Sequence, residues 1–576
     1  MANIVFIKMM EVFAMSNTIL SGFRVFSPGA APLIASLCRI CQVQQTVDQM
    51  VQWRETARLT PGQIVEALII NILCDRRPLW KMEQFFYEID LSLLYGKEIT
   101  PDHLNDDILG RCLDKIAEID LNKLVSQIGL QALLAHSLSL RVLHIDTTSI
   151  SVEGEYANQS EDDKFLIDKG HSKDHRADLK QFKIGLASQE QGMICGGQLL
   201  SGHESDKSWN PQMIEDMFTF FQSKGQDGTI FVIDSAGISG KTLATWQEKK
   251  LKIISRFPET FNLATEVKLQ AWQENIWNEI GKIAAGKDGS IYKSRSFLVE
   301  VEGTPVRLIV AHSTALEELK IHTLQKKVDK QGNKLEKEAK AVMKTSFACE
   351  ADAQTALGAF LNAHKDSPYE ISGQVIHQQK AKHGRRGRPK ASEEPELIST
   401  YIVHLEIGRL IQERYDQLLQ LESTFVLVTT LPESSHSDES VLCEYKNQNS
   451  IENRFRFIKQ PAYLGPVYLK NPQRVKALGY VFILALMIGS YLEYRIRSAM
   501  EKENEVLILP GKKKVSQPSL NTMMEFFDTL KVARIRVGEN IIRQWPENVD
   551  PQAIKLIRWA GFVPDIYLTG LSGNVA

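Results

Sequence analysis

The sequence lacks an excess of charge of either sign. Its 68 basic and 70 acidic residues leave a formal net charge of −2 over 576 residues. Many DNA-binding domains are strongly basic, so the overall charge argues weakly against a nucleic-acid partner, and any phosphate contacts must come from local basic patches. A hydrophobic content of 43% and a charged content of 24% are ordinary for a globular protein. A chain of this length is expected to hold several domains.

Cysteine is scarce and scattered. The seven cysteines are odd in number, which favours a reducing compartment over a disulfide framework. Cys38 and Cys41 form one Cys-x-x-Cys pair. No second pair follows at the spacing of a structural zinc site, so we do not expect zinc.

Long uncharged apolar runs are also absent. The longest, from Ala477 to Leu492, has 16 residues, which is short of the roughly 20 that span a bilayer. Charges on both flanks indicate a buried core helix over 474–497. The apolar N-terminal stretch is broken by Lys8 and Glu11 and has no evident small-residue cleavage site. We expect no membrane segment and a cytoplasmic location.

Two aspartates each follow a short apolar run. RVLHIDTTSISVEG (141–154) contains Asp146, and GTIFVIDSAGIS (228–239) contains Asp234. Both runs are typical of buried strands that deliver a carboxylate at the strand end. A buried aspartate is costly unless it is paired or holds a metal ion, so the two positions are candidate metal ligands.

A third carboxylate lies in YKNQNSIENRFRFIK (445–459). Ile451 and Phe455 have helical spacing, which predicts an amphipathic helix with one face on a core. Glu452 flanks that stripe, and Lys459 lies two turns further along nearly the same face. A carboxylate and a cation so placed suit a metal and a phosphate, although taken alone they are more typical of ordinary surface charges.

In this order, Asp146, Asp234 and Glu452 resemble the DDE triad of bacterial insertion-sequence transposases. The likeness extends over nearly the whole chain. It is carried further by PDHLNDDILGRCLDKI (101–116), GHSKDHRADLKQ (170–181), SRFPETF (255–261) and PVYLKNPQRVKALGYVFILAL (466–486).

The segment around Glu452 narrows the resemblance. Tyr445, Gln448, Glu452 and Lys459 are spaced like the Tyr–Arg–Glu–Lys signature of one large group of these transposases. That group carries a long insertion between the second aspartate and the glutamate. Gln448 stands where the signature has arginine, so a basic contact is lost at this position.

The resemblance implies Mg²⁺-dependent cleavage of DNA at the ends of an insertion sequence, followed by strand transfer. Asp146, Asp234 and Glu452 would be catalytic and would hold two Mg²⁺ ions, for which Mn²⁺ can substitute. Lys459 would contact a DNA phosphate, and Tyr445 would hydrogen-bond the same backbone. The expected partners are double-stranded DNA, as element ends and target, and a second copy of the chain in a homodimer acting at the nucleoid.

The fold implied is α/β, with a ribonuclease H-like core built on a mixed sheet. A helical N-terminal domain precedes the core, and a β-containing insertion interrupts it. The expected parts are a helical N-terminal, DNA-end-binding domain (1–135), the first part of the core (138–257), the insertion (258–430), the second part of the core (431–500) and a small C-terminal tail domain (501–576).

Local patterns predict individual elements of these parts. Thr60 as an N-cap with Pro61 in the first turn predicts a helix start. The helices of 25–135 are either a plain packing domain or carry a helix that reads the major groove. Strands are expected at 181–189, 193–202, 229–234 and 251–257, helices at 211–222, 239–250 and 315–343, a hairpin around Glu302–Gly303 over 290–313, and strands returning to the sheet at 401–408 and 424–431.

Several polar and aromatic stretches have two readings. HQQKAKHGRRGRPK (377–390) contains Arg386 and Arg388 in a pattern that resembles an AT-hook, which lies in a narrow minor groove, and it suits a basic linker equally well. The basic residues of 170–181 form either a solvated loop or a phosphate-positioning loop. The lysines of 315–343 mostly suit a solvated helix face, and Trp272 and Trp277 suit core packing more than base stacking.

Two other functions fit parts of the sequence. A degenerate, transposase-derived protein could bind DNA without cutting it, and Gln448 is the feature that motivates this reading. A two-carboxylate glycosidase fits the aspartate strands but not the basic run.

Overall fold

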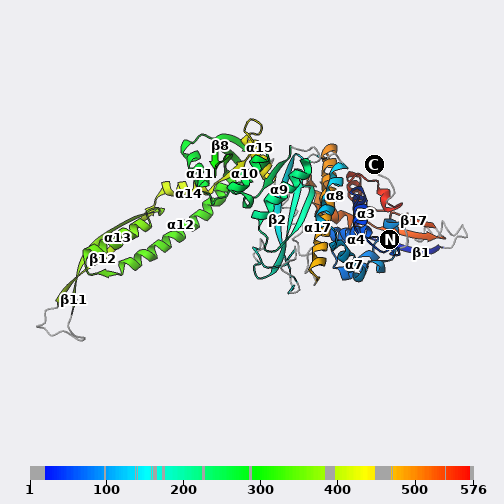
Figure 1. Ribbon diagram of the computed structural model, residues 1–576, viewed down its shortest axis with the longest axis horizontal. Helices are drawn as coiled ribbons and strands as arrows, with labels where there is room; N and C mark the ends of the chain where they lie inside the picture. The colour runs from blue at the N-terminus through cyan, green and yellow to red at the C-terminus, as the bar shows by residue number, and fades with distance from the viewer. Residues whose placement is uncertain are drawn as a thin grey trace. The chain divides into compact units, whose positions relative to one another are not determined.

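The computed structural model describes residues 20–96, 99–135, 138, 140–152, 154–156, 159, 165–171, 176–222, 228–283, 289–382, 396–447, 469, 471–538 and 540–570. The chain divides into two compact units, the first comprising Met1–Ser255 and Glu444–Ala576 and the second Arg256–Cys443. Both units mix helices and strands (Figure 1). They are called unit 1 and unit 2 below.

Unit 1 contains a mixed sheet whose strands follow the order β4-β3-β2-β5-β6. β3 is antiparallel to β2 and β4, whereas β2, β5 and β6 are parallel. The strand expectations for this region are confirmed. The strands are β2 (Val142–Val152), β3 (Lys180–Gln189), β4 (Ile194–Ser201), β5 (Ile230–Ile233) and β6 (Lys252–Arg256).

Helices cover both faces of this sheet (Figure 1). On one face, a Cβ added at Gly185 would lie 2.2 Å from the ring of Trp209 on α9 (Asp206–Gln222). On the other, a Cβ at Gly197 would lie 2.9 Å from Ile483 on α17 (Pro472–Glu503). Glycine at these strand positions therefore lets each helix approach the sheet closely.

The long helix α17 is the centre of unit 1. It contacts β4 and the helices α2, α4, α7, α8 and α19, and Asn471 caps its N-terminus by accepting a hydrogen bond from the Gln473 amide. By length and composition the whole helix could cross a membrane, but 89% of its most apolar window is buried inside the protein. The predicted core helix is therefore confirmed.

The segment before the sheet is helical, as the sequence indicates. Thr60 and Gln63 form a capping box at the start of α4, with Oγ1 of Thr60 accepting from the Gln63 amide at 3.2 Å and the Gln63 side chain accepting from the Thr60 amide at 3.1 Å. The helices are α2 (Ala31–Ile40), α3 (Val43–Met50), α4 (Pro61–Cys74), α5 (Met82–Tyr87), α6 (Leu91–Tyr95), α7 (Asp106–Ala117) and α8 (Leu121–Leu134).

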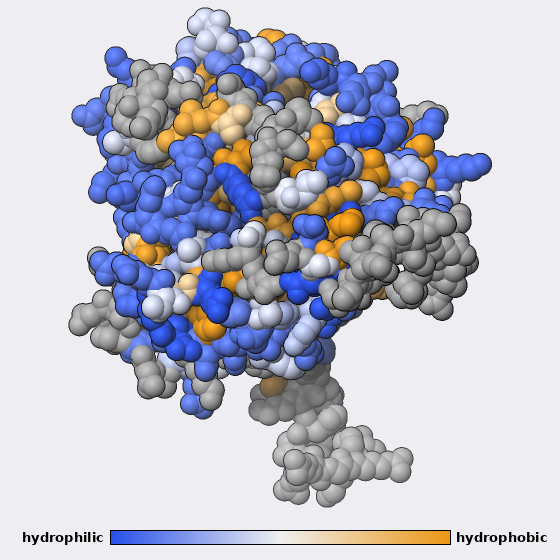
Figure 2. All heavy atoms as spheres, turned by 90° about the vertical axis from the view of Figure 1, so that its right-hand side faces the viewer, coloured by the Kyte–Doolittle hydropathy of each residue, from blue (hydrophilic) through white to orange (hydrophobic). Residues whose placement is uncertain are grey.

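The C-terminal residues of unit 1 pair with its first strand. β1 (Leu20–Phe26) is antiparallel to β16 (Val532–Val537), which pairs with β17 (Asn540–Gln544). α18 (Leu520–Phe527) and α19 (Pro551–Trp559) flank these strands along the chain. Figure 2 shows hydrophobic patches among hydrophilic atoms on the side of the molecule that carries β1 and β17. The exposed apolar side chains in these strands are Phe23, Val25 and Ile542.

Unit 2 contains an antiparallel sheet in the order β13-β9-β8-β7. The expected hairpin is confirmed, because β8 and β9 are joined at Glu302 and Gly303, whose φ angles of 48° and 82° suit a tight two-residue turn. The strands are β7 (Asn278–Lys282), β8 (Ile291–Val301), β9 (Thr304–Ser313) and β13 (Thr424–Thr429), and the helices are α11 (Asn262–Glu274), α12 (Thr314–Met343), α13 (Glu350–Ala363) and α14 (Gln412–Glu422).

One strand expectation for unit 2 is wrong. The stretch 401–408 does not return to the sheet of β9 and β13. It lies in β12 (Glu396–Leu410), which pairs along its length with β11 (Tyr369–Lys382) and also with β10 (Ser346–Phe347). The apolar alternation that indicates a strand does not identify its partner, and here the partner is the preceding strand of a long hairpin.

Candidate functional site

The two candidate aspartates lie side by side on neighbouring parallel strands. β2 and β5 pair in register from Val142↔Ile230 to Ile145↔Ile233. Asp146 is the next residue of β2, and Asp234 directly follows the last residue of β5. Two segments separated by more than eighty residues of sequence therefore bring two carboxylates to the same level of the sheet.

The two aspartates also have the same local geometry. Oδ1 of Asp146 accepts a hydrogen bond from the Thr147 amide at 2.7 Å, and Oδ1 of Asp234 accepts one from the Ser235 amide at 2.7 Å. Asp234 thereby caps the short 3₁₀ turn η3 (Ser235–Gly237). Both side chains are half-buried. Each carboxylate is thus oriented by its own backbone and remains partly open to solvent.

The strand-end prediction is correct for Asp234 and wrong for Asp146. β5 ends at Ile233, directly before Asp234. β2 instead continues to Val152, because its other edge stays paired with β3 and Asp146 lies opposite Leu186. The parallel pairing with β5 is what stops at Ile145. Asp146 therefore lies where two strands part rather than where its own strand ends.

A neutral histidine lies in β2 two residues before Asp146. His144 is fully buried, and burial lowers its pKa to about 4. It lies opposite Ser188 on β3. In the part of the chain that the structure describes, neither ring nitrogen of His144 has a hydrogen-bond partner. The imidazole is uncharged at neutral pH and contributes no positive charge beside the aspartates.

Glu452, Gln448 and Lys459 lie outside the described residues. Tyr445 is half-buried in α15 (Asp438–Lys446), whose acidic first turn begins seven residues earlier. Tyr445 therefore lies in the last turn of a helix that starts at Asp438.

Within the described ranges, no group of three or more histidine, cysteine, aspartate or glutamate side chains could hold a metal ion. The adjacent pair Asp146 and Asp234 supplies two carboxylates. Oxygen donors of this kind are the ligands that Mg²⁺ prefers, and Mg²⁺ commonly takes one or two protein carboxylates and completes its shell with water and phosphate oxygens. The donor chemistry of the pair therefore fits Mg²⁺.

The first part of the basic run at 377–390 belongs to a strand. Residues 377–382 belong to β11, which stays paired with β12 as far as Lys382↔Glu396. The reading of the whole run as a linker is therefore wrong for its first six residues. Arg386 and Arg388 lie outside the described residues.

Part of the loop at 170–181 is held by its own contacts. Arg176 pairs with Asp178 at 2.8 Å, and its hydrogen bond lowers the pKa of that exposed carboxyl. Lys180 donates to the backbone carbonyl of Glu155. Lys173 and His175 lie outside the described ranges. For Arg176 and Lys180, these contacts favour the interpretation as a solvated loop over a phosphate-positioning role.

The tryptophan pair packs within unit 2, as expected. Trp272 and Trp277 are half-buried and meet edge to face, with ring centroids 5.0 Å apart. Nζ of Lys293 lies 4.4 and 4.7 Å from their centroids, and Nε1 of Trp272 donates to Thr424 at 3.0 Å. Both rings are therefore engaged by neighbours from the same unit.

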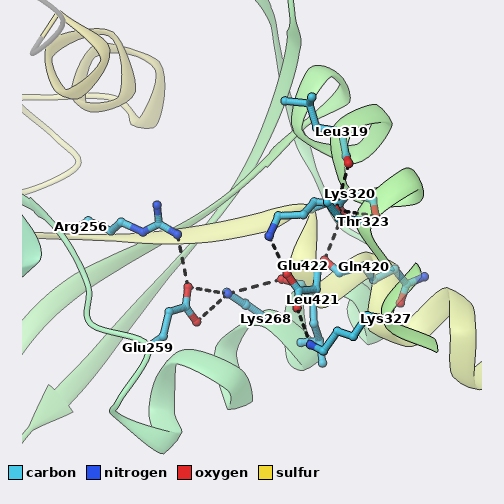
Figure 3. Close-up of polar contacts among 11 residues, drawn as sticks. Arg256, Glu259, Lys268, Leu319, Lys320, Thr323, Lys327, Gln420, Leu421 and Glu422 are labelled. Atoms are coloured by element: carbon cyan, nitrogen blue, oxygen red, sulfur yellow. Dashed lines mark hydrogen bonds and ion pairs between the residues drawn. The ribbon is translucent and has the colours of Figure 1, made fainter. Parts of the chain in front are cut away.

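Residues of the motif at 255–261 form ion pairs in unit 2 (Figure 3). Glu259 accepts from the buried Lys268 with both oxygens at 2.8 Å and lies 3.7 Å from Arg256. In the same view, Lys320 and Lys327 pair with Glu422 at 2.7 and 3.2 Å. These two lysines of α12 are thus neutralised within the unit, which favours the solvated-face reading for this part of the helix.

Sequence reasoning missed the residues that tie the aspartate strands together. Arg141 directly precedes β2 and binds Glu444 in α15 at 2.7 Å. Neither residue stands out in the sequence, because a charged side chain beside an apolar run is common and no local pattern links positions so far apart. The only available signal is that each borders a stretch carrying a candidate acid.

Comparisons with known proteins cover the chain unevenly. A family model described as a domain of unknown function (DUF4277) matches residues 29–130, which contain the N-terminal helices and not the aspartates. No curated protein sequence matches the chain. A solved structure described as the piggyBac transposase synaptic complex with hairpin DNA is similar at a TM-score of 0.36 and 10% identity, covering 86% of this chain and 79% of that one.

Proposed function

We propose that this protein is a DNA transposase that cleaves DNA at the ends of an insertion sequence and joins the freed ends to a target, with Mg²⁺ as cofactor. The observation that carries the proposal is the register of β2 and β5, which sets Asp146 and Asp234 side by side. The order β4-β3-β2-β5-β6, with its parallel and antiparallel pairs, supports the ribonuclease H-like core that the sequence resemblance implies.

The chemistry required is in-line displacement at phosphorus. Mg²⁺, when bound, supplies a Lewis acid that activates the attacking oxygen and stabilises the leaving one. Asp146 and Asp234 would hold it, each carboxylate being oriented by the amide of the next residue. Glu452 would be the third ligand, and Tyr445 and Lys459 would bind the DNA backbone. No covalent protein–DNA intermediate is needed.

A second candidate is a DNA-binding protein derived from a transposase that no longer cuts. Gln448 favours it, because the signature has arginine at this position. Such a protein would bind the ends of the element through its N-terminal helices without nicking the DNA.

The deciding experiment incubates the full-length protein with the terminal repeats that flank its reading frame, in Mg²⁺ or in EDTA. We expect cleavage at the repeat tips only with Mg²⁺, and its loss in Asp146→Asn and in Asp234→Asn with DNA binding kept. Asp216→Asn, an exposed aspartate on α9, is the matched control and should cleave normally. Mg²⁺-dependent cleavage by Asp146→Asn would remove the site assignment. Tight binding without nicks by the unmodified protein would favour the second candidate.

A further inference from the structure

Arg141 binds two carboxylates and one backbone amide in unit 1. Its Nη2 donates to Oε1 of Glu444 at 2.7 Å, and its Nε donates to Oε2 of Glu190 at 3.0 Å. Its backbone carbonyl accepts a hydrogen bond from the Ile230 amide at 2.9 Å. A single residue thus contacts three segments that are far apart in the sequence.

These contacts lie at the starts of the segments that carry the candidate acids. Arg141 is the residue before β2, which leads to Asp146. Ile230 is the first residue of β5, which leads to Asp234. Glu444 lies in the last turns of α15, from which the chain continues toward Glu452. Arg141 therefore links both aspartate strands with the helix that precedes the third acid.

The pair with Glu444 joins a buried carboxylate to a half-exposed guanidinium. The Glu444 side chain is only 11% exposed, whereas that of Arg141 is 53% exposed. Among the described residues, the second oxygen of Glu444 has no hydrogen-bond partner. Removing the guanidinium would leave a buried, uncompensated carboxylate, which is strongly unfavourable. The Glu444 region would then shift to reach solvent or another cation.

Glu190 provides an internal comparison. It pairs with the same guanidinium, at 2.7 Å from Nη2. It lies in the turn between β3 and β4, which carries none of the candidate acids. The same arginine therefore makes one ion pair with the helix that precedes Glu452 and one with a turn that carries no candidate catalytic acid.

We propose that Arg141 is a positioning residue for the DNA cleavage proposed above, on which this inference rests. Its backbone carbonyl joins the starts of β2 and β5, and its guanidinium holds this junction against the end of α15. The chain therefore leaves α15 toward Glu452 from a point that is fixed relative to the strands of Asp146 and Asp234. Arg141 itself touches neither DNA nor metal in this role.

The test measures cleavage of the terminal repeats by the full-length protein over a series of Mg²⁺ concentrations. Supporting partners of metal ligands typically contribute about 10–100-fold to metal affinity or activity, so we expect Arg141→Ala and Glu444→Gln each to slow cleavage at low Mg²⁺ by about 10-fold or more. The Mg²⁺ concentration for half-maximal cleavage should rise, and DNA affinity should stay unchanged. A loss of folded protein alone would lower the amount of activity without shifting the Mg²⁺ requirement.

Three further variants sharpen the test. Glu190→Gln should behave like the unmodified protein. Arg141→Lys should recover part of the loss, because lysine keeps the charge but not the forked geometry. The double variant Arg141→Ala/Glu444→Gln should be no worse than the more damaging single variant, since both remove one interaction. Arg141→Ala and Glu444→Gln variants with an unchanged Mg²⁺ requirement would overturn the proposal.

A second measurement tests the role of Arg141 independently of the proposed DNA cleavage. If the unmodified protein cleaves nothing, hydrogen exchange still measures the contacts of Arg141. Arg141→Ala and Glu444→Gln should then raise exchange at the end of α15, and Glu190→Gln should not. Unchanged exchange in all three variants would overturn the positioning role whatever the protein does to DNA.

Discussion

Asp114 holds Arg474 through two parallel hydrogen bonds of 2.7 Å, from Nε to Oδ1 and from Nη2 to Oδ2. Asp114 lies on α7 and Arg474 in the first turn of α17. Gly110, one turn before Asp114, makes room for the guanidinium, since a Cβ there would lie 2.9 Å from Nη1 of Arg474. Two of the stretches that carry the sequence resemblance are therefore joined by one forked ion pair.

We expect this forked pair to stabilise the attachment of α7 to α17. The hydrogen bond from Arg474 lowers the pKa of Asp114, but both side chains are about one-third exposed, which limits the gain to about 1 kcal/mol. Asp114→Asn and Arg474→Gln should each raise hydrogen exchange in α7, and the double variant should show a non-additive effect. Lys115→Gln, which breaks an exposed pair with Glu118, should change little. Fully additive effects would contradict a direct coupling.

A buried carboxyl should make the stability of the N-terminal helices fall as the pH rises from about 4.5 to about 8. Burial raises the pKa of Glu66, on α4, to about 8, although Arg39 opposes the shift. A pKa that is higher in the folded state means that stability is fully present below the unfolded pKa and is lost as the pH rises toward 8. The loss is at most about 1.4 kcal/mol per pH unit. Hydrogen exchange of the α4 amides between pH 5 and 9, corrected for the intrinsic exchange rate, should show this decrease in stability with pH.

Glu66→Gln should remove that slope, because the amide does not titrate. The matched control is Glu55→Gln, at an exposed position in the same region, which should leave the slope unchanged. A Glu66→Gln variant that retains the full pH dependence would assign it to another group.

Much of the secondary structure is predictable from the sequence, for local physical reasons. The Thr60 cap, the Glu302–Gly303 turn and the apolar run before Asp234 are each defined by neighbouring residues. α9 shows where a local signal fails. Pro211 suggests a helix start, yet α9 begins at Asp206 and carries Pro211 inside it. Burial of Trp209 against the sheet offsets the missing backbone hydrogen bond.

The candidate site is only partly predictable. An aspartate after a strand-like run can be found from the sequence, and this pattern predicts both aspartates. That the two lie level depends on the register between β2 and β5, which a strand pattern does not encode. The Arg141–Glu444 pair depends on the same tertiary arrangement. The pairing of β1 with β16, across more than five hundred residues, likewise leaves no local trace.

The buried histidine of β2 should make that strand sensitive to acid. Burial lowers the pKa of His144 to about 4, from an ordinary 6.5. The unfolded chain therefore binds more protons between these two values, and stability falls as the pH drops from about 6.5 toward 4, by at most about 1.4 kcal/mol per pH unit. Hydrogen exchange of the β2 and β5 amides should report the loss. His144→Phe should flatten the dependence, and His322→Gln, on an exposed face of α12, should not. A steep acid slope that survives in His144→Phe would exclude this histidine as its source.

Two helical glycines should respond to alanine in opposite directions. A Cβ at Gly129, on α8, would lie 2.2 Å from the backbone oxygen of Cys195 at the start of β4, whereas a Cβ at Gly358, on α13, would meet nothing within 4 Å. Gly358→Ala should stabilise its helix by roughly 0.5–1 kcal/mol, because alanine loses less backbone entropy. Gly129→Ala gains the same term but must push α8 away from β4, and such overpacking costs about 1–3 kcal/mol.

Hydrogen exchange measures the two effects separately, because α8 and β4 lie in unit 1 and α13 lies in unit 2. Exchange should rise around Gly129→Ala and fall around Gly358→Ala. Gly129→Ser should be at least as destabilising as Gly129→Ala, because its added atoms begin from the same Cβ position. Equal protection of α8 in Gly129→Ala and in the unmodified protein would mean that α8 does not pack on β4 this closely. That result would contradict the close packing of α8 on β4, the edge strand of the sheet that carries Asp146.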